Sequence, residues 1–97
     1  MTSVADLQRA IDVLDDEIIE RLGRRFGHAR EIGRVKQALG QPPFDPERRR
    51  GQQDRFVEAC VSHGLDAGMA RMLIAVIGAQ VLVERLESFG SPPSAGR

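Results

Sequence analysis

The chain of 97 residues has no tryptophan or tyrosine, four phenylalanines and a single cysteine, Cys60. One cysteine cannot form an internal disulfide, and no His/Cys cluster accompanies it as a structural zinc site would require. Both facts fit a reducing compartment, so we expect a cytoplasmic protein without a bound metal. The scarcity of aromatic rings argues against a protein that stacks single-stranded nucleic acid.

The N-terminus lacks both the basic start and the apolar run of a secretory signal. The best apolar stretch, Met72 to Val83, is too short to span a bilayer and contains Gln80. We therefore expect a soluble protein with no membrane partner.

Charge is balanced overall, with 14 basic and 14 acidic residues, but it is distributed unevenly. Residues 1–20 hold one basic and six acidic residues, whereas residues 21–50 hold nine basic and three acidic residues. This basic middle segment is either a solvated face or a site for an anion. Because aromatic residues are not interleaved with it, we expect a small anion rather than nucleic acid.

Apolar residues recur at helical spacing through the first third of the chain. Ser3 is a predicted N-cap, and Gly40 followed by Pro42 and Pro43 predicts the helix end. About 35 residues at 1.5 Å each form a rod of roughly 50 Å, too long to be covered by the rest of so short a chain. The length therefore predicts a homodimer, paired through this stripe: Leu7, Ile11, Leu14, Ile18, Leu22, Ala29, Ile32 and Val35.

Three glycines, Gly23, Gly27 and Gly33, interrupt this helix, and each costs about 1 kcal/mol relative to alanine. Close approach of another helix or room for a ligand would offset that cost.

Two shorter helices follow. Asp45 as N-cap and proline at the first helical position predict a second helix ending near Ser62. After a Gly-containing break, Asp66 predicts the start of a third helix that runs to about Ser88. Residues 1–89 thus form one all-α, three-helix domain with a long first helix, and residues 90–97 have the composition of a disordered tail.

Arg25 and Lys36 lie eleven residues apart, so they share a helix face with Ala29 and Ile32 between them. The two cations either extend into solvent or bind one anion together. In the third helix, Gln80 and Glu84 continue an apolar stripe. Buried polar groups need partners, so an interhelical hydrogen bond and a ligand contact are both open.

The sequence lacks the residue patterns typical of acid–base, covalent or metal catalysis. His28, His63 and Cys60 have no acid, base or nucleophile at a telling spacing, and no phosphate loop or metal-ligand motif occurs. A cation-rich site with one carboxyl group and one amide suits electrostatic stabilisation of a reacting anion.

Three segments, Leu7–Lys36, Phe44–Arg49 and His63–Leu86, resemble the all-helical class of chorismate mutases. The most telling part is I-D-x-L-D-x-x-I followed by an Arg pair and a lysine eleven residues past the second Arg. The resemblance implies an intertwined homodimer with a shared long first helix. It also implies an isomerase of the shikimate pathway for aromatic amino acids, which rearranges a small dicarboxylate, chorismate, to prephenate without a cofactor.

The same resemblance implies roles for individual residues. Arg25 would clamp a carboxylate, and Lys36 would lie near the ether oxygen and a carboxylate. Arg48 and Asp45, which is also the N-cap, would lie at the ring side, where the substrate carries its hydroxyl.

Two further roles depend on the alignment of the third helix. Gln80 would touch a carboxylate if one residue is deleted early in that helix. Glu84 would then donate to the ether oxygen, which requires a protonated carboxyl group. We therefore expect activity to rise toward acidic pH.

The sequence departs from the family pattern at two places. Gln8 stands where the family has an arginine that reaches the partner chain's site, with Arg9 beside it, and Arg49 stands where a glutamate is common. These changes suggest a weak mutase that needs a stimulating partner enzyme, or a relative with another substrate. Isochorismate-pyruvate lyase and a mutase of amino-substituted chorismate are the enzymatic alternatives, and a non-catalytic helical dimerisation or regulatory module is the alternative of another class.

Overall fold

The computed structural model describes residues 1–90 and contains three α-helices in succession: α1 (Val4–Ala38), α2 (Pro46–Ser62) and α3 (Ala67–Gly90). No strand occurs in these residues, so the predicted all-α, three-helix chain is confirmed.

The third helix was predicted to end near Ser88, and α3 ends at Gly90. The division into a domain of residues 1–89 and a tail of residues 90–97 stays a prediction. The remaining part of the predicted tail, residues 91–97, lies outside the described residues.

Side-chain caps and a glycine set the limits of α1. The hydroxyl of Ser3 accepts from the amide of Asp6 at 3.0 Å, and the Asp6 carboxylate accepts from the amide of Ser3 at 3.2 Å. This capping box satisfies amides that a helix start leaves without partners. At the other end, Gly40 adopts φ +69°, and the amide of Gln41 donates to the Lys36 carbonyl at 2.8 Å.

The two shorter helices begin at the predicted aspartates. Asp45 accepts from the amide of Arg48 at 3.2 Å, and Asp66 accepts from the amide of Met69 at 2.9 Å. Between the helices, Gly64 takes a left-handed φ of +83°, which allows the chain to reverse within a short turn.

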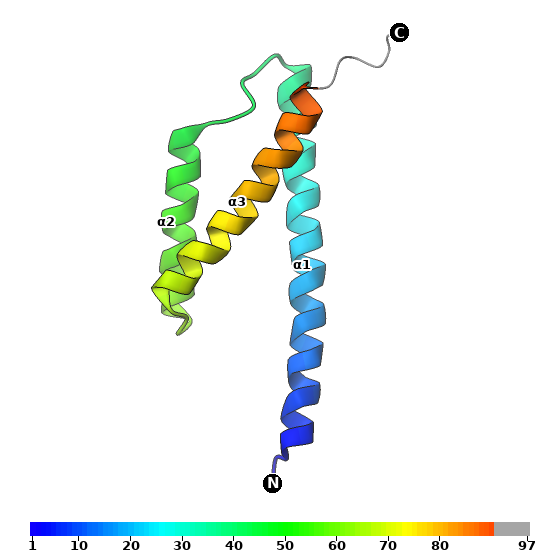
Figure 1. Ribbon diagram of the computed structural model, residues 1–97, viewed down its shortest axis with the longest axis vertical. Coiled ribbons are helices and arrows are strands. Elements are labelled where there is room, and N and C mark those ends of the chain that lie inside the picture. Colours follow the sequence, from blue (N-terminus) through cyan, green and yellow to red (C-terminus); the bar gives the residue numbers. More distant parts are fainter. Residues whose placement is uncertain (91–97) are drawn as a thin grey trace.

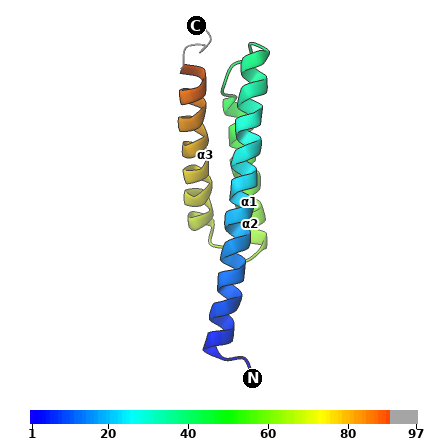
Figure 2. The ribbon, with the colours of Figure 1, turned by 90° about the vertical axis from the view of Figure 1, so that its right-hand side faces the viewer.

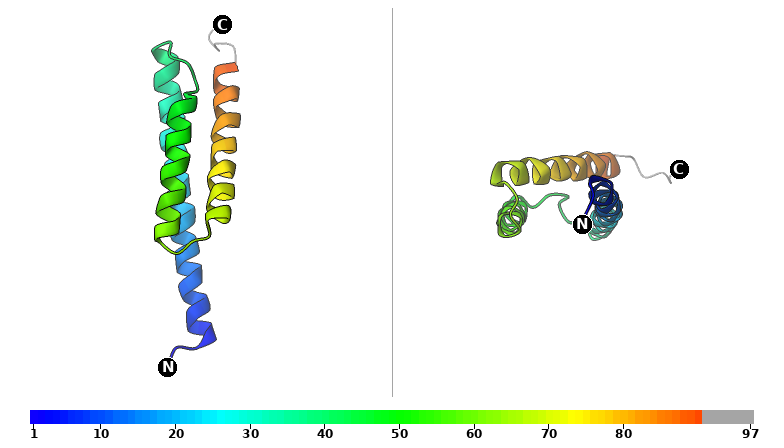
Figure 3. Two further views of the ribbon diagram at one scale, coloured as in Figure 1. Left: turned by 90° about the vertical axis from the view of Figure 1, so that its left-hand side faces the viewer. Right: turned by 90° about the horizontal axis from the view of Figure 1, so that it is seen from below.

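α3 is the central helix. It packs against α2 and against the C-terminal half of α1, whereas α1 and α2 do not contact each other within the described residues. Viewed along the long axis, α3 extends from above α2 to above α1 (Figure 3, right). The N-terminal half of α1 extends beyond both other helices (Figures 1 and 2). The chain is accordingly elongated, at 64 × 29 × 16 Å.

Few apolar side chains are buried in this arrangement. Among the apolar residues of α3, Ile77 is buried, whereas Met72 and Val76 are exposed. The buried apolar residues of the described chain are Cys60, Ala70, Ile74 and Ile77. All but Cys60 are on α3, which agrees with its central position.

The apolar stripe of α1 is uncovered. Leu7, Ile11 and Leu14 are each 55% exposed, and Gly33 is the one buried residue of α1. A run of exposed apolar side chains along one helix face marks a candidate interaction surface.

α3 also corrects the length argument made from the sequence. Its residues Ala67–Phe89 are long and apolar enough to cross a membrane by length and composition, so the shorter Met72–Val83 stretch was the wrong measure. One such helix is weak evidence for a membrane span, and in this chain both other helices pack against α3.

Candidate active site

An open groove of about 380 Å³ lies between the three helices, within the size range of small-ligand sites. α1, the α1–α2 linker, α2 and α3 all contribute to it. Its lining residues are Arg25, Ala29, Ile32, Lys36, Phe44, Asp45, Pro46, Arg48, Arg49, Arg50, Gln52, Gln53, Ile74, Gly78, Val81, Leu82 and Arg85.

One face of α1 forms the first wall. Arg25, Ala29, Ile32 and Lys36 all line the groove, as their spacing over three helical turns predicts. Two cations therefore flank an apolar strip. Such a wall can hold a ligand with an apolar body and anionic ends.

The α2 wall begins at the helix N-terminus. Asp45 and Arg48, both predicted site residues, line the groove here. Asp45 uses one carboxylate oxygen to cap α2. A carboxylate has about four lone-pair positions, so capping leaves acceptor capacity for a ligand hydroxyl.

The groove carries a large excess of positive charge. Asp45 is its one acidic residue, and its cations are Arg25, Lys36, Arg48, Arg49, Arg50 and Arg85. Within residues 1–90 none of these six takes part in an ion pair, whereas arginines elsewhere do, as in Arg24–Glu20 and Arg34–Glu31. An anionic ligand would supply the missing countercharge.

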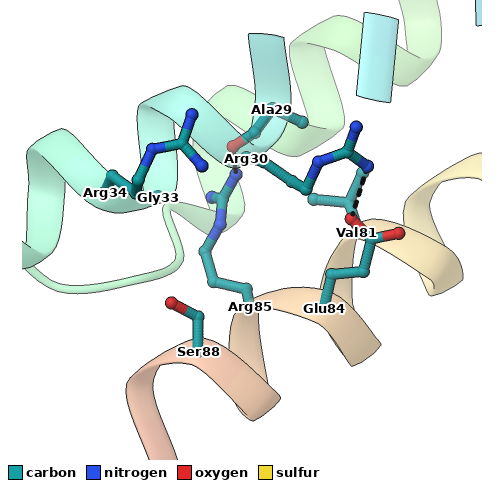
Figure 4. A pocket seen from close by; sticks show the side chains of 8 residues that line it. All are labelled: Ala29, Arg30, Gly33, Arg34, Val81, Glu84, Arg85 and Ser88. Carbon is teal, nitrogen blue, oxygen red and sulfur yellow. Dashed lines mark hydrogen bonds and ion pairs between the residues drawn. The ribbon is translucent and has the colours of Figure 1, made fainter. Parts of the chain in front are cut away.

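Gln80 and Glu84 do not line this groove. The Glu84 carboxylate accepts from Nε2 of Gln80, one turn earlier on α3, at 2.8 Å. It also accepts from Nη1 of Arg30 at 3.3 Å, across the interface between α3 and α1 (Figure 4). The hydrogen bond from Gln80, helped by Arg30 and opposed by partial desolvation, lowers the pKa of Glu84 below its ordinary value. Glu84 is therefore an ionised acceptor at neutral pH, and its role as a donor to ligand stays a prediction.

Gln8 and Arg9 lie in the part of α1 that extends past the other helices, away from the groove of their own chain. The guanidinium of Arg9 forms an ion pair with Asp6, one turn earlier on the same helix. Their predicted role concerns a second chain and stays a prediction.

Three of the six groove cations, Arg49, Arg50 and Arg85, were not predicted as site residues from the sequence. Nη2 of Arg49 lies 2.9 Å from where a Cβ on Gly78 would be. Arg85 approaches Gly33 in the same way, with Nε 3.3 Å from the corresponding Cβ position. A helical glycine opposite an arginine is the signal that marks both contacts.

No group of three His, Cys, Asp or Glu side chains in residues 1–90 is arranged to hold a metal ion.

The fold and groove can be compared with known proteins. The chorismate mutase type II family matches residues 7–85, which include most of all three helices. The chorismate mutase of Methanocaldococcus jannaschii is 27% identical over 74 residues, 76% of this chain and 75% of that protein. The isochorismate pyruvate lyase of Pseudomonas aeruginosa is 30% identical over 86 residues, 89% of this chain and 84% of that protein. Since the match covers the groove and the helices that build it, the chain belongs to the chorismate mutase type II family.

Proposed function

We propose that this protein is a chorismate mutase, an isomerase that converts chorismate to prephenate in the shikimate pathway. The observation that carries the proposal is the convergence of Arg25, Lys36 and Arg48 on one groove without carboxylate partners in the described chain. Chorismate brings two carboxylates and an apolar ring, which this wall of cations and apolar residues complements.

The reaction needs no group beyond such a site. The ether C–O bond of chorismate breaks while a C–C bond forms, and no proton or electron is gained or lost. Negative charge grows on the ether oxygen during the step. Fixed cations therefore accelerate it by holding the compact conformer and stabilising that charge.

Within this mechanism Arg25 clamps one carboxylate, and Lys36 lies near the ether oxygen and a carboxylate. Arg48 and Asp45 contact the ring side, with Asp45 accepting from the substrate hydroxyl. The positions of all four on the groove support these roles.

Glu84 is proposed to contact the ether oxygen, and Gln80 a carboxylate. Neither residue lines the groove in the free chain, so both side chains would have to move into it. For this Glu84 must leave Arg30 and take up a proton, because an ionised carboxylate cannot donate. The pH dependence of the reaction decides this part of the assignment.

The active form is proposed to be an intertwined homodimer. The uncovered stripe on the N-terminal half of α1 supports a second copy as its cover, because Leu7, Ile11 and Leu14 are all more exposed than buried. In such a dimer Gln8 or Arg9 would reach the partner's groove and act on the second carboxylate.

We place the enzyme in the cytoplasm, where its single cysteine stays reduced. Because Gln8 replaces an arginine clamp and Arg49 replaces an acceptor, we also propose that a partner enzyme raises a low intrinsic activity. Addition of a cytosolic extract to the purified protein tests this by the change in kcat.

Product identification tests the function. Purified protein is incubated separately with chorismate and isochorismate, and products are separated by chromatography. Prephenate from chorismate is the expected result. If prephenate forms no faster than in the uncatalysed rearrangement at every protein concentration tested, the proposal is contradicted.

Isochorismate pyruvate lyase is the second candidate, favoured by the similarity to the Pseudomonas aeruginosa protein of that name. Pyruvate and salicylate from isochorismate would select it, and turnover of amino-substituted chorismate would select the related mutase. If no substrate turns over and calorimetry detects no binding of a bicyclic dicarboxylate analogue, the chain is a helical dimerisation module.

A further inference from the structure

Arg85 joins three parts of the chain that are distant in sequence. From α3, its Nη1 donates to the Pro43 carbonyl in the α1–α2 linker, and its Nη2 donates to the Ala29 carbonyl of α1, each at 2.9 Å. Figure 4 shows the side chain crossing from α3 toward Ala29. The side chain is partly buried, so water competes less with these bonds than at an exposed site.

These bonds matter because α1 and α2 do not contact each other directly. The separation between the cations of α1 and those of α2 is therefore set through α3 and through the linker. Pro43 lies two residues before Asp45, the residue that starts α2. Holding the Pro43 carbonyl thus holds the end of α2 that carries Arg48.

Gly33 makes room for this arrangement. A Cβ at residue 33 would lie 3.3 Å from Arg85 Nε and 3.8 Å from its Cδ, closer than most real Cβ contacts in the first case. Glycine inside a helix costs about 1 kcal/mol relative to alanine. The two hydrogen bonds of Arg85 offset that cost, so neither helix approach nor ligand space is needed to explain Gly33.

We propose that Arg85 is a positioning residue, whose two carbonyl contacts hold the α1 and α2 walls of the groove at the separation that a dicarboxylate requires. The kinetic part of this inference rests on the proposed function. A lysine cannot replace Arg85, because one ammonium lacks the planar fork that reaches two carbonyls at once.

Kinetics of three variants form the first test. For Arg85→Met we expect kcat/KM to fall by about 100-fold, as small misplacements of reacting groups do. Arg85→Lys should recover little of the loss. Gly33→Ala should lower kcat/KM by about 10-fold, although alanine is the better helix former, and this effect should vanish in the Arg85→Met background. Arg71→Met, the same change at an exposed position of α3, is the control and should leave kcat/KM unchanged.

Hydrogen exchange forms the second test and needs no activity. In Arg85→Met we expect faster exchange of the hydrogen-bonded amides at the two ends of the α1–α2 linker, those of Gln41, Arg48 and Arg49, with exchange of the buried part of α3 unchanged. Unchanged exchange of these three amides would overturn the proposal, even if kcat/KM falls, because Arg85 would then act on the ligand directly. A Gly33→Ala effect that persists without Arg85 would overturn it as well. If the wild-type protein turns over no substrate, the proposed function fails, while the exchange data still decide the role of Arg85.

Discussion

The guanidinium of Arg49 lies against Gly78, with Nη2 2.9 Å from the position of a Cβ on that glycine. Arg49 therefore extends from α2 to the surface of α3, where a side chain at residue 78 would obstruct it. Its presence here adds a donor where the family often has an acceptor, which makes it the residue most suited to alter substrate preference.

Gly78→Ala should displace Arg49 and weaken ligand binding. The clash falls on the far end of a flexible side chain, so the fold should tolerate it and α3 should gain roughly 0.5–1 kcal/mol of helix propensity. We expect calorimetry with a bicyclic dicarboxylate analogue to show about tenfold weaker binding, close to the value of one charge-assisted hydrogen bond. Gly51→Ala is the matched control, because a Cβ there meets no atom within 4 Å. Equal affinities for both variants would show that Arg49 does not contact the ligand.

Lys36→Met should abolish most of the activity while leaving the fold intact. Methionine keeps the apolar stem but removes the charge that we propose lies near the ether oxygen, so kcat/KM should fall by about 100-fold or more. Arg55→Met, on an exposed part of α2 outside the groove, should have no effect. Thermal unfolding of both variants checks that neither is destabilised. A Lys36→Met enzyme with near wild-type kcat/KM would remove lysine from the mechanism.

Acidic pH should raise activity if protonated Glu84 donates to the ether oxygen. Its pKa is lowered in the free chain, so above that pKa the protonated fraction, and with it kcat/KM, should grow about tenfold per unit of falling pH. Glu84→Gln supplies a neutral donor at every pH and should flatten this profile. Glu31→Gln, which removes an exposed carboxylate paired with Arg34, should keep it. An unchanged profile in Glu84→Gln would end the assignment.

The lowered pKa of Glu84 also affects the stability of the fold. Stability should fall toward acidic pH, whereas activity should rise. A carboxyl group whose folded-state pKa is lowered stabilises the fold above its unfolded pKa, and this contribution disappears as pH falls through the folded value. Because the Arg30–Glu84 pair is partly exposed, its contribution should stay below about 1 kcal/mol. Denaturant unfolding of Arg30→Gln at neutral and acidic pH measures it, and the difference from wild type should shrink in acid.

Leu14→Asp should convert the proposed dimer to a monomer. A charge in the centre of a buried α1 stripe would be desolvated without a partner, which costs several kcal/mol. Sedimentation should then give a species of 10.7 kDa instead of twice that mass. Val13→Asp places the same charge about 100° around α1 from Leu14, beside the stripe rather than on it, and should disturb the dimer far less. A wild-type protein that sediments as a monomer at micromolar concentration would contradict the dimer outright.

Much of this protein follows from local sequence. Ser3, Asp45 and Asp66 start the helices as their side-chain oxygens predict, since capping involves only neighbouring amides. The shared face of Arg25 and Lys36 also follows from helical geometry alone, because a spacing of eleven residues brings two side chains to the same side of any α-helix.

The orientation of α3 was decided by the tertiary structure. This helix is apolar on most sides, so periodicity did not reveal which face meets the groove, and one residue of shift turns a side chain by about 100°. Val81 and Arg85 consequently line the groove, whereas Gln80 and Glu84 lie outside it, with Glu84 facing Arg30. The sequence by itself determined three capped helices, a cationic α1 face and an apolar stripe in need of cover. Which α3 side chains meet those cations depended on packing between distant helices, which no local pattern encodes.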